Sequence, residues 1–514
     1  MAVHGCTWIT CLNKLPIPAR LMRPCAKGAI VNAQFEKRFA ELSQRDNIAL
    51  LRYIRRGIEK ESLRITPAGK LAQTAHPAAL GSALTHPCIT TDYSEALLEF
   101  ITAPDTELSN TLAELDNIHR FVYPRIDTEL LWTASMPCLL EQDADIPVAR
   151  YGSSNVARMK TIYRVGLGHR YGRLMQTIAG IHFNFSLDDD FWEWLHAAVH
   201  SQLSLRDFKT EQYFALIRNF RRHAFVLLYL FGASPAVCGS FVAGRDHGLQ
   251  PIASAPGTLH MPHGTSLRMG RLGYQSDAQS RLAVSYNSLE TYAGSLEAAL
   301  TQPYAPYEAI GIKNLGGEYN QLATTLLQIE NEFYGTIRPK RVIRSGERPL
   351  HALLERGVEY VEVRCMDLDP FVPVGITAAT MRFLDAFLLH CLLQDSPPDT
   401  LDEMAELARN QHRTAAFGRE PGLTLERHGQ NVRLTDWAAE LLAEIAPVAA
   451  ALDAAHGCTA YADAVAAARA SAAAPDTLPS AHVLSAMQRD FDGNFTAFVR
   501  AQSDQARNHL LALP

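Results

Sequence analysis

The sequence predicts an α+β fold, in which a strand-rich core is followed by a helical C-terminal region. Between about residues 46 and 395, short segments alternate apolar and polar side chains, which is the period of a β-strand. Beyond residue 400 the chain is rich in Ala, Leu and Glu, and residues 438–455 and 460–474 have the spacing of helices. A polar, Pro-containing segment at 394–399 separates the two regions and predicts a loop or linker.

We therefore expect three parts along the chain. Residues 46–395 form the core that carries the chemistry, and residues 396–514 form helices that pack on this core and carry little chemistry. Residues 1–45 form an N-terminal extension, whose first 35 residues contain four basic and no acidic side chains. A transit peptide is one interpretation of that composition. The interpretation we favour is either a loose, disordered extension or a start codon placed too early, with Met22 as one alternative start.

The charge balance argues against nucleic acid as the main partner. The chain of 514 residues has 48 Lys and Arg against 54 Asp and Glu, a net charge of −6. Proteins that bind nucleic acid usually show a basic excess, which is missing from this sequence. A mildly acidic protein can still bind an anion such as ATP, but it then needs local basic residues or metal ions.

Cysteine usage and hydropathy predict a cytoplasmic protein that does not cross a membrane. The nine cysteines include no C-x-x-C pair, which argues against a zinc ribbon or a dithiol redox site. An odd number of cysteines in a long chain indicates reduced thiols in the cytoplasm. The longest apolar stretch, residues 224–242, is interrupted by Gly, Ser and Pro, so it predicts a buried core segment rather than a membrane span.

Residues 57–65 (GIEKESLRI) predict the first strand that carries candidate functional residues. In a strand, Glu59 and Glu61 point to the same face. Two like charges side by side are unfavourable unless a cation lies between them. Taken alone, this motif favours a solvated face over a cation site.

Residues 91–101 (TDYSEALLEFI) contribute two further carboxylates, Asp92 and Glu99. Alternation places Leu98 and Phe100 toward the core and Glu99 away from it.

Residues 181–186 (IHFNFS) alternate strictly between an aromatic and aliphatic face and a polar face. We expect the apolar side to contact the core, which leaves His182 and Asn184 on the opposite face. A single histidine in this setting is usually a satisfied or surface residue.

Residues 358–364 (VEYVEVR) place Glu362 and Arg364 on one face of a predicted strand. Two interpretations stay open. The two residues could form a surface ion pair worth well under about 1 kcal/mol, or a metal ligand beside an anion-binding arginine.

Residues 327–334 (LQIENEFY) predict a strand whose alternation groups four polar side chains, and they lead directly into a basic cluster. The grouped side chains are Gln328, Glu330, Glu332 and Tyr334. The basic cluster contains Arg338, Lys340 and Arg341. A basic cluster beside an acidic face suits a polyphosphate held through Mg²⁺.

The accumulation of these motifs predicts a metal-binding sheet. Mg²⁺ takes oxygen ligands, usually carboxylates together with phosphate and water. The sequence contains no Walker A motif, Gly-rich kinase loop or G-x-G-x-x-G fingerprint. If ATP binds, metals on such a sheet would bridge its phosphates and neutralise the charge that develops during phosphoryl transfer. The side chains that the open face would gather are Glu59, Glu61, Glu99, His182 and Glu362.

At these residues the sequence resembles the proteobacterial glutamate–cysteine ligases, also called γ-glutamylcysteine synthetases. The likeness runs in register from about residue 50 to 385 and is weaker toward the end. Its most distinctive stretches are GIEKESLRI, HPAALGSALTHPCITTDYSEALLEFIT, YGRLMQTIAGIHFNFSL, YLFGASPAVC, TSLRMGRLGY, QIENEFYGTIRPKR and VEYVEVRCMDLDPF. The extension before residue 45 is longer than this family requires, and the C-terminal tail is shorter than in some members.

The resemblance implies a glutamine-synthetase-like fold, with a curved, mainly antiparallel sheet whose concave face is the active site. It implies ATP-dependent ligation of the γ-carboxylate of L-glutamate to the amine of L-cysteine, the first step of glutathione synthesis. It also implies Mg²⁺, or Mn²⁺ in its place, and glutathione as a feedback inhibitor.

The resemblance further implies a role for each matching residue. The metal residues would be Glu59, Glu61, Asp92, Glu99, His182 and Glu362. The groups around glutamate and its phosphorylated carboxylate would be Gln176, Asn184, Arg268 and Arg364, and the pocket for cysteine would contain Tyr163, Tyr274 and Tyr334. The residues that bind the nucleotide would be Arg338, Lys340 and Arg341. We expect Glu362 and Arg364 to act in catalysis, with Arg364 stabilising charge on the transferring phosphoryl group.

Three alternative functions stay open at this point. The nearest is a carboxylate–amine ligase of the same fold with a different acid or amine. A catalytically silent metal- or nucleotide-binding regulator would be expected to have lost ligand carboxylates, but all six metal candidates are present. A metal-dependent hydrolase would be expected to have a closely spaced histidine pair such as H-E-x-x-H, which the sequence lacks.

Overall fold

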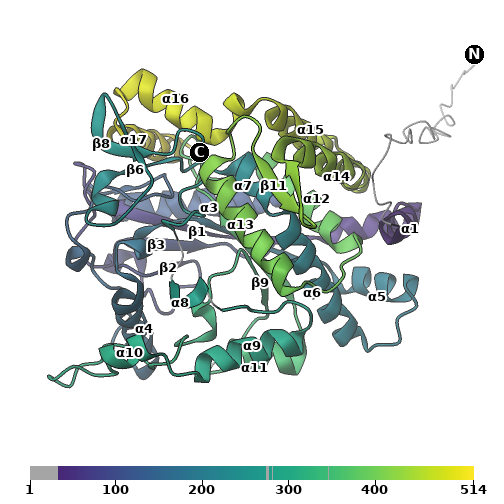
Figure 1. Ribbon diagram of the computed structural model, residues 1–514, viewed down its shortest axis with the longest axis horizontal. Helices are drawn as coiled ribbons and strands as arrows, with labels where there is room; N and C mark the ends of the chain where they lie inside the picture. Colours follow the sequence, from purple (N-terminus) through teal and green to yellow (C-terminus); the bar gives the residue numbers. More distant parts are fainter. Residues whose placement is uncertain (1–32, 274–276, 281, 345, 514) are drawn as a thin grey trace, which may run out of the picture.

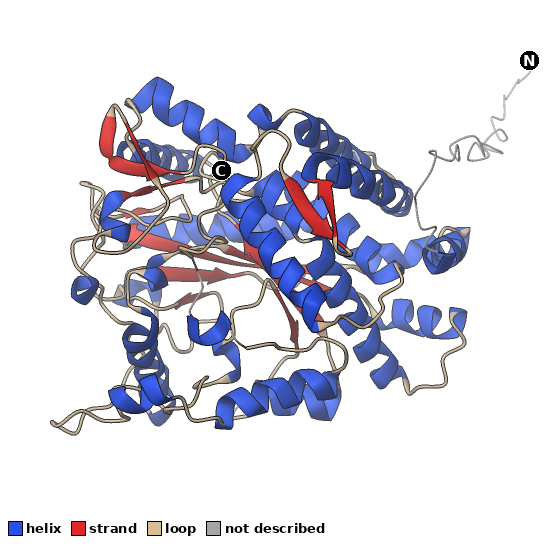
Figure 2. Ribbon diagram, in the orientation of Figure 1, coloured by secondary structure: helices blue, strands red, loops and turns tan. Residues whose placement is uncertain are grey.

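A seven-stranded antiparallel sheet lies at the centre of the molecule, with helices around it (Figures 1 and 2). The computed structural model describes residues 33–273, 277–280, 282–344 and 346–513. The strands of the central sheet are β1 (Arg55–Ile65), β2 (Ile89–Thr91), β3 (Leu97–Ile101), β4 (Leu130–Leu131), β5 (Ile181–Ser186), β9 (Ile337–Lys340) and β10 (Tyr360–Met366). Their order is β2-β3-β1-β5-β10-β9, with β4 beside β1. Because all of these ladders are antiparallel, the predicted α+β fold with a mainly antiparallel sheet is confirmed.

Five further strands of the described residues lie outside the central sheet. They form a three-stranded sheet of order β6-β8-β7 and a hairpin, β11-β12. Their bounds are β6 (Ala236–Cys238), β7 (Gln250–Ile252), β8 (Ala255–His260), β11 (Thr424–Arg427) and β12 (Gln430–Arg433).

Helices make up most of the remaining structure (Figure 2). Their bounds are α1 (Ala33–Leu42), α2 (Arg45–Ile48), α3 (Leu108–Val122), α4 (Asn155–Tyr171), α5 (Asp189–Ala198), α6 (Leu205–His223), α7 (Phe225–Phe231), α8 (Asp277–Ser280), α9 (Leu289–Thr301), α10 (Ala305–Ile310), α11 (Pro349–Arg356), α12 (Ala378–Leu393), α13 (Leu401–Phe417), α14 (Leu434–His456), α15 (Ala460–Ala473), α16 (Pro479–Phe491) and α17 (Phe495–Ala512). Among the described residues, none of these helices is both long and apolar enough to cross a membrane.

One face of the central sheet is apolar and packs on the core. It carries Ile58, Phe100, Phe183 and Val363, all with essentially no exposed surface. Helices α3, α6 and α7 contact the strands, and α12 packs against α3 and α6. The alternation expected for β3, β5 and β10 is therefore confirmed, because Leu98 and Phe100, Phe183 and Phe185, and Val361 and Val363 are all buried on this side. In β1 the opposite face is only partly polar, because Leu63 and Ile65 follow Glu59 and Glu61 on it.

The C-terminal helices lie close to where the sequence places them. Helices α14 and α15 cover the two predicted segments and pack against each other and against α12. Helix α13 lies in front of the sheet in Figure 1. At the other end of the chain, α1 packs on α12, so residues 33–42 of the predicted extension are helical. Residues 1–32 lie outside the described part of the chain.

The apolar stretch 224–242 is part of the core, as predicted. It forms α7, β6 and the turns around them, and most of its residues are buried.

The prediction that residues 327–334 alternate as a strand is wrong. Glu330–Glu332 form a turn of 3₁₀ helix, so the four polar side chains do not share one face. Glu332 is buried and pairs with Arg170 Nη1 at 3.1 Å, whereas Glu330 pairs with Arg348 at the surface.

A buried ion pair connects the sheet to the helices behind it. Arg56 Nε of β1 lies 2.7 Å from Asp385 Oδ2 of α12, and neither side chain is exposed. Arg56 also donates to the hydroxyl of Tyr461 in α15 at 3.1 Å.

We expect Asp385→Ala to reduce the free energy of unfolding by about 3–5 kcal/mol, because it leaves a buried guanidinium without its counter-ion. Urea denaturation followed by tryptophan fluorescence would measure the change. Asp490→Ala is the matched control, because Asp490 pairs with Arg489 at the surface and its loss should leave the midpoint unchanged. Equal midpoints for the two variants would contradict this assignment.

Candidate active site

The face of the sheet opposite the core gathers charged side chains from five adjacent strands. Antiparallel pairing sets Glu61 of β1 opposite Glu99 of β3, and Glu59 opposite His182 of β5. Farther along, Glu362 of β10 lies opposite Asn184 on one side and Arg338 of β9 on the other. Residues opposite each other in a sheet point to the same side. Carboxylates from distant parts of the chain are therefore brought together.

An irregularity in β10 adjusts the position of Arg364. The register between β10 and β5 shifts between Val363 and Met366, so that β10 contains one extra residue there. Bulges of this kind redirect a side chain and are common beside active sites. Arg364 Nη1 lies 3.1 Å from Glu362 Oε2 and 3.3 Å from His182 Nδ1. The ion pair between Glu362 and Arg364 is therefore present, but Glu362 is buried within the charged cluster, so this is not a pair on the open surface.

Two groups of side chains in this cluster could hold a metal ion. The first contains Glu59, His182 and Glu362, and the second contains Glu61, Glu99 and His182. Within each group the candidate ligand atoms all lie within 4.8 Å of one another. His182 belongs to both groups.

Short contacts hold the first group in place. Glu59 accepts hydrogen bonds from Asn184 Nδ2 at 2.9 Å, and its Oε2 lies 3.1 Å from His182 Nδ1. Burial, and then Arg364, lower the pKa of His182, which favours the neutral ring that a metal requires.

Fixed cations compensate the carboxylate at one end of the cluster. Burial alone would raise the pKa of Glu362, but Lys340 and Arg364 outweigh it and hold the pKa well below its ordinary value. Lys340 Nζ lies 3.1 Å from Glu362 Oε1.

At the other end of the cluster, positive charges offset the carboxylates of Glu61 and Glu99 less completely. Burial, and then Asp92, raise the pKa of Glu61 to about 8. Burial, and then Glu59, raise the pKa of Glu99 well above its ordinary value. Divalent cations would supply the positive charge that this end needs.

The donor set fits a hard cation such as Mg²⁺. It consists of carboxylate oxygens and one imidazole, and Mg²⁺ prefers oxygen ligands. The side-chain oxygen of Asn184 is buried beside Glu59 and has no hydrogen-bond donor among the described residues. Such an oxygen is suited to a cation or to the ammonium group of a substrate.

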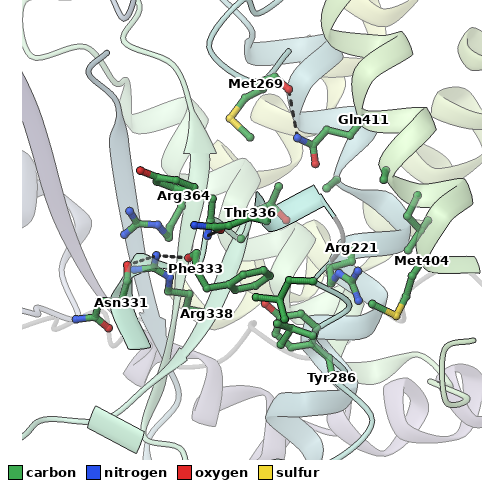
Figure 3. Close-up of a pocket in the computed structure, with 18 of the residues that line it drawn as sticks. Arg221, Met269, Tyr286, Asn331, Phe333, Thr336, Arg338, Arg364, Met404 and Gln411 are labelled. Atoms are coloured by element: carbon green, nitrogen blue, oxygen red, sulfur yellow. Dashed lines mark hydrogen bonds between the residues drawn. The ribbon is translucent and has the colours of Figure 1, made fainter. Parts of the chain in front are cut away.

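A cavity of about 450 Å³ opens over the charged cluster (Figure 3). Its sheet side is polar and includes Glu61, Asp92, Tyr163, Arg164, Gln176, Arg268, Tyr334, Arg338 and Arg364. Its other side comes from helices and includes Phe225, Met404, Ala405, Ala408 and Gln411. Figure 3 shows Arg364 and Asn331 at one end, and Arg221, Tyr286 and Met404 at the other.

Three of the four residues expected around glutamate, Gln176, Arg268 and Arg364, line the polar side of this cavity. The fourth, Asn184, lies beside Glu59 on the sheet and is not among the lining residues. Arg268 is buried, and its Nη2 donates to the backbone carbonyl of Arg364 at 2.8 Å. Gln176 is also buried, and its Nε2 donates to the hydroxyl of Tyr334 at 3.1 Å.

Two of the three tyrosines expected around cysteine line the same cavity. Tyr163 comes from α4 and Tyr334 from the segment before β9. The ring of Tyr334 meets that of Tyr171 edge-to-face, with centroids 5.9 Å apart. Tyr274 lies outside the described residues.

The three basic residues expected at the nucleotide have different surroundings. Arg338 is buried and donates to the carbonyls of Asn331 at 2.9 Å and Phe333 at 2.5 Å (Figure 3). Arg341 donates to the carbonyl of Gly357 at 3.1 Å, at the end of α11. All three line a second cavity of about 310 Å³, together with Tyr360 and Leu350.

Sequence reasoning missed several residues that line the site, and two contributors are the clearest cases. Arg164 of α4 lines the cavity and donates to the backbone carbonyl of Asp92. It directly follows Tyr163 in the sequence. Lys160, Arg164 and Leu167 are spaced four and three residues apart, so a helix would place them on one face, and this spacing could have predicted Arg164. The other contributor is α13, which lies in the C-terminal region where we expect little chemistry.

Comparison with known proteins shows which family this chain resembles. The family model described as glutamate-cysteine ligase matches residues 39–414. A glutamate–cysteine ligase of Azotobacter vinelandii is 52% identical over 483 residues, which are 93% of this chain and 90% of the relative. One of Pseudomonas aeruginosa is 52% identical over 480 residues, with the same coverage.

Solved structures agree with these sequence matches. The glutamate–cysteine ligase of Francisella tularensis, crystallised in complex with AMP, superposes with a TM-score of 0.83 at 37% identity. The match covers 90% of this chain and 89% of that one. A bifunctional glutathione synthetase of Pasteurella multocida has a TM-score of 0.71 at 25% identity, covering 93% of this chain and 55% of the larger protein. With its carboxylate-lined sheet face and these matches over nearly its whole length, the chain belongs to the glutamate–cysteine ligase family.

Proposed function

We propose that this glutamate–cysteine ligase joins the γ-carboxylate of L-glutamate to the amine of L-cysteine through a γ-glutamyl phosphate made with ATP. One observation carries the proposal. Carboxylates from separate strands converge beside a cavity that also contains Arg268 and Arg364. Phosphoryl transfer depends on positioning and positive charge rather than on a protein nucleophile. This combination is what the two-step ligation needs.

Mg²⁺, or Mn²⁺ in its place, would be held by Glu59, His182 and Glu362 and by Glu61, Glu99 and His182. Asp92 lies at the cavity edge beside the second group. When bound, such cations would neutralise charge on the phosphates of ATP.

In the first step an oxygen of the glutamate γ-carboxylate attacks the γ-phosphorus of ATP, and ADP leaves. Arg268, Gln176 and Asn184 orient glutamate, and Arg364 stabilises negative charge on the transferring phosphoryl group. Glu362 supports this step by holding Arg364 and Lys340 within 3.1 Å of its own carboxylate.

In the second step the neutral amine of cysteine attacks the acyl carbon, and the carbon–oxygen bond to phosphate breaks. The amine loses a proton, and inorganic phosphate leaves. Tyr163 and Tyr334 lie at the polar side of the cavity, where we place the cysteine substrate, and Tyr274 is assigned there by its motif.

We place the nucleotide at the second cavity, beside Lys340 and Arg341. This cavity shares Arg338 and Asn331 with the first one, so a nucleotide here would direct its phosphates toward the carboxylates. The AMP complex of the Francisella relative supports a nucleotide site in this fold.

The proposal extends to regulation and location. Glutathione contains the γ-glutamyl–cysteine unit of the product, so we propose that it inhibits by competing for the first cavity. We place the reaction in the cytoplasm, where the six free cysteines of the described chain would stay reduced.

ADP release measured with each amino acid alone and with both together tests the proposed reaction. We expect rapid release only when glutamate and cysteine are both present. With glutamate alone, ¹⁸O should exchange between bridging and non-bridging positions of the β-phosphate of bound ATP, because the acyl phosphate forms reversibly. Preferred turnover with 2-aminobutyrate, alanine or glycine instead of cysteine would point to a different ligase. ADP release without amino acids would indicate a hydrolase.

Glu59→Gln and Glu362→Gln should each reduce kcat/KM by more than about a hundredfold, because even residues behind a metal ligand typically contribute 10- to 100-fold. Circular dichroism should show an unchanged fold. Glu141→Gln is a matched control, because Glu141 pairs with Lys70 at the surface, far from the cluster in sequence. Near-normal turnover of either cluster variant would remove its residue from the proposed site.

Cation binding should strengthen as the pH rises through about 8. The pKa of Glu61 is raised from 4.5 to about 8, so the cation-free folded protein keeps a proton there that the unfolded chain releases. Its stability should therefore fall as the pH rises from about 4.5 to 8. Because a cation replaces this proton, Mg²⁺ should raise the Tm more at pH 9 than at pH 6.

Differential scanning calorimetry with and without Mg²⁺ at both pH values would measure this difference. Glu61→Gln should lose most of the pH dependence. An equal Mg²⁺ effect at both pH values in the unmodified protein would argue against Glu61 as a ligand.

A further inference from the structure

A buried glycine lies between the charged cluster and Arg268. Gly180 directly precedes β5, and its backbone is fixed on both sides by Glu61. Its N–H donates to Glu61 Oε2 at 2.8 Å, and its carbonyl accepts from the N–H of Glu61 at 3.0 Å. Its φ is outside the left-handed region, so the backbone conformation does not itself require glycine.

Space is what excludes a side chain at this position. A Cβ atom on Gly180 would lie 2.2 Å from Nη2, 2.4 Å from Cζ and 2.6 Å from Nε of Arg268. Real Cβ contacts are essentially never closer than 3.0 Å. The guanidinium of Arg268 therefore occupies the volume that a side chain at position 180 would fill.

Contacts on its other sides limit where the guanidinium can lie. Nη2 donates to the carbonyl of Arg364 at 2.8 Å, and Nη1 lies 4.0 Å from Asp367 Oδ1. Asp367 is itself held by the hydroxyls of Ser234 at 2.6 Å and Ser266 at 3.1 Å. Arg268 is only 2% exposed, so a methyl group at position 180 would meet a side chain with little free space around it.

We infer that Gly180 is a positioning residue for glutamate binding, because its missing side chain provides the space in which the Arg268 guanidinium lies beside the cavity. The inference rests on the proposed function, in which Arg268 contacts the glutamate substrate. Gly180 touches no reacting atom, and its missing side chain acts through Arg268.

Gly180→Ala isolates this role. The substitution keeps the backbone N–H that binds Glu61 and adds one methyl group. The atoms close to this methyl group belong to the guanidinium end of the flexible Arg268 side chain. We therefore expect the Arg268 side chain to move, while the backbone of the sheet stays in place. We expect the KM for glutamate to rise about tenfold or more, as when one partner of a buried charge pair is lost. The KM for ATP and the Tm should change much less.

A double-mutant cycle with Arg268→Ala tests whether the two residues act together. In the Arg268→Ala background the clash no longer exists, so Gly180→Ala should have no further effect on the KM for glutamate. Where turnover is too slow to measure, the rise in Tm on adding glutamate reports the same binding. Gly294→Ala in α9 is the matched control, because a Cβ there meets nothing within 4 Å.

Each outcome of the cycle has a defined meaning. An unchanged KM for glutamate in Gly180→Ala, or independent effects that add in the double variant, would overturn the inference. If Gly180→Ala fails to fold, the double variant must fold for the inference to stand. If Arg268→Ala itself leaves the KM for glutamate unchanged, the assignment of the glutamate site falls, which is a separate failure.

Discussion

The repulsion among carboxylates on one face of the central sheet is the constraint around which the site is arranged. Glu59, Glu61, Glu99 and Glu362 are brought together by the pairing of β3, β1, β5 and β10. At the Glu362 end, Lys340 and Arg364 offset the repulsion. At the other end, burial leaves the pKa of Glu61 and of Glu99 raised, which is a cost that divalent cations would remove.

Burial of the apolar face of the same sheet offsets the free-energy cost of gathering charges on the other face. Phenylalanine and branched aliphatic side chains from each strand pack against α3, α6 and α7, and this burial stabilises the sheet. Charged groups of β1 that enter this side have polar partners. Arg56 pairs with Asp385, and Lys60 lies 2.9 Å from His119 and 2.7 Å from the hydroxyl of Ser62. Burial lowers the pKa of Lys60 to about 7. The sheet thus separates a dry, apolar side from a charged side across a single layer of backbone.

Contacts with neighbouring segments then hold in position the side chains that line the cavity. Glu332 does not face the cavity as a ligand. It accepts from Arg170 at 3.1 Å and from the hydroxyl of Tyr171 at 2.7 Å, and Tyr171 packs against Tyr334. Arg338 holds the turn before β9 through two backbone carbonyls. In the same way, Gly180 and Asp367 limit the position of Arg268. Charged residues near the site therefore divide into those that line the cavity and those that hold others in place.

The sequence by itself determined the fold class, the shared face of Glu59 and Glu61 in β1, the polar and apolar faces of β3, β5 and β10, and the helices α14 and α15. These features follow from local periodicity, which needs no knowledge of distant residues. Only the tertiary structure decided that Glu61 lies opposite Glu99, that β10 contains an irregularity beside Arg364, and that α13 and Arg164 line the cavity. It also turned Glu332 inward, where a 3₁₀ turn breaks the expected alternation. Strand register and close approaches such as that of Arg268 to Gly180 depend on residues far apart in the chain, which is why periodicity could not predict them.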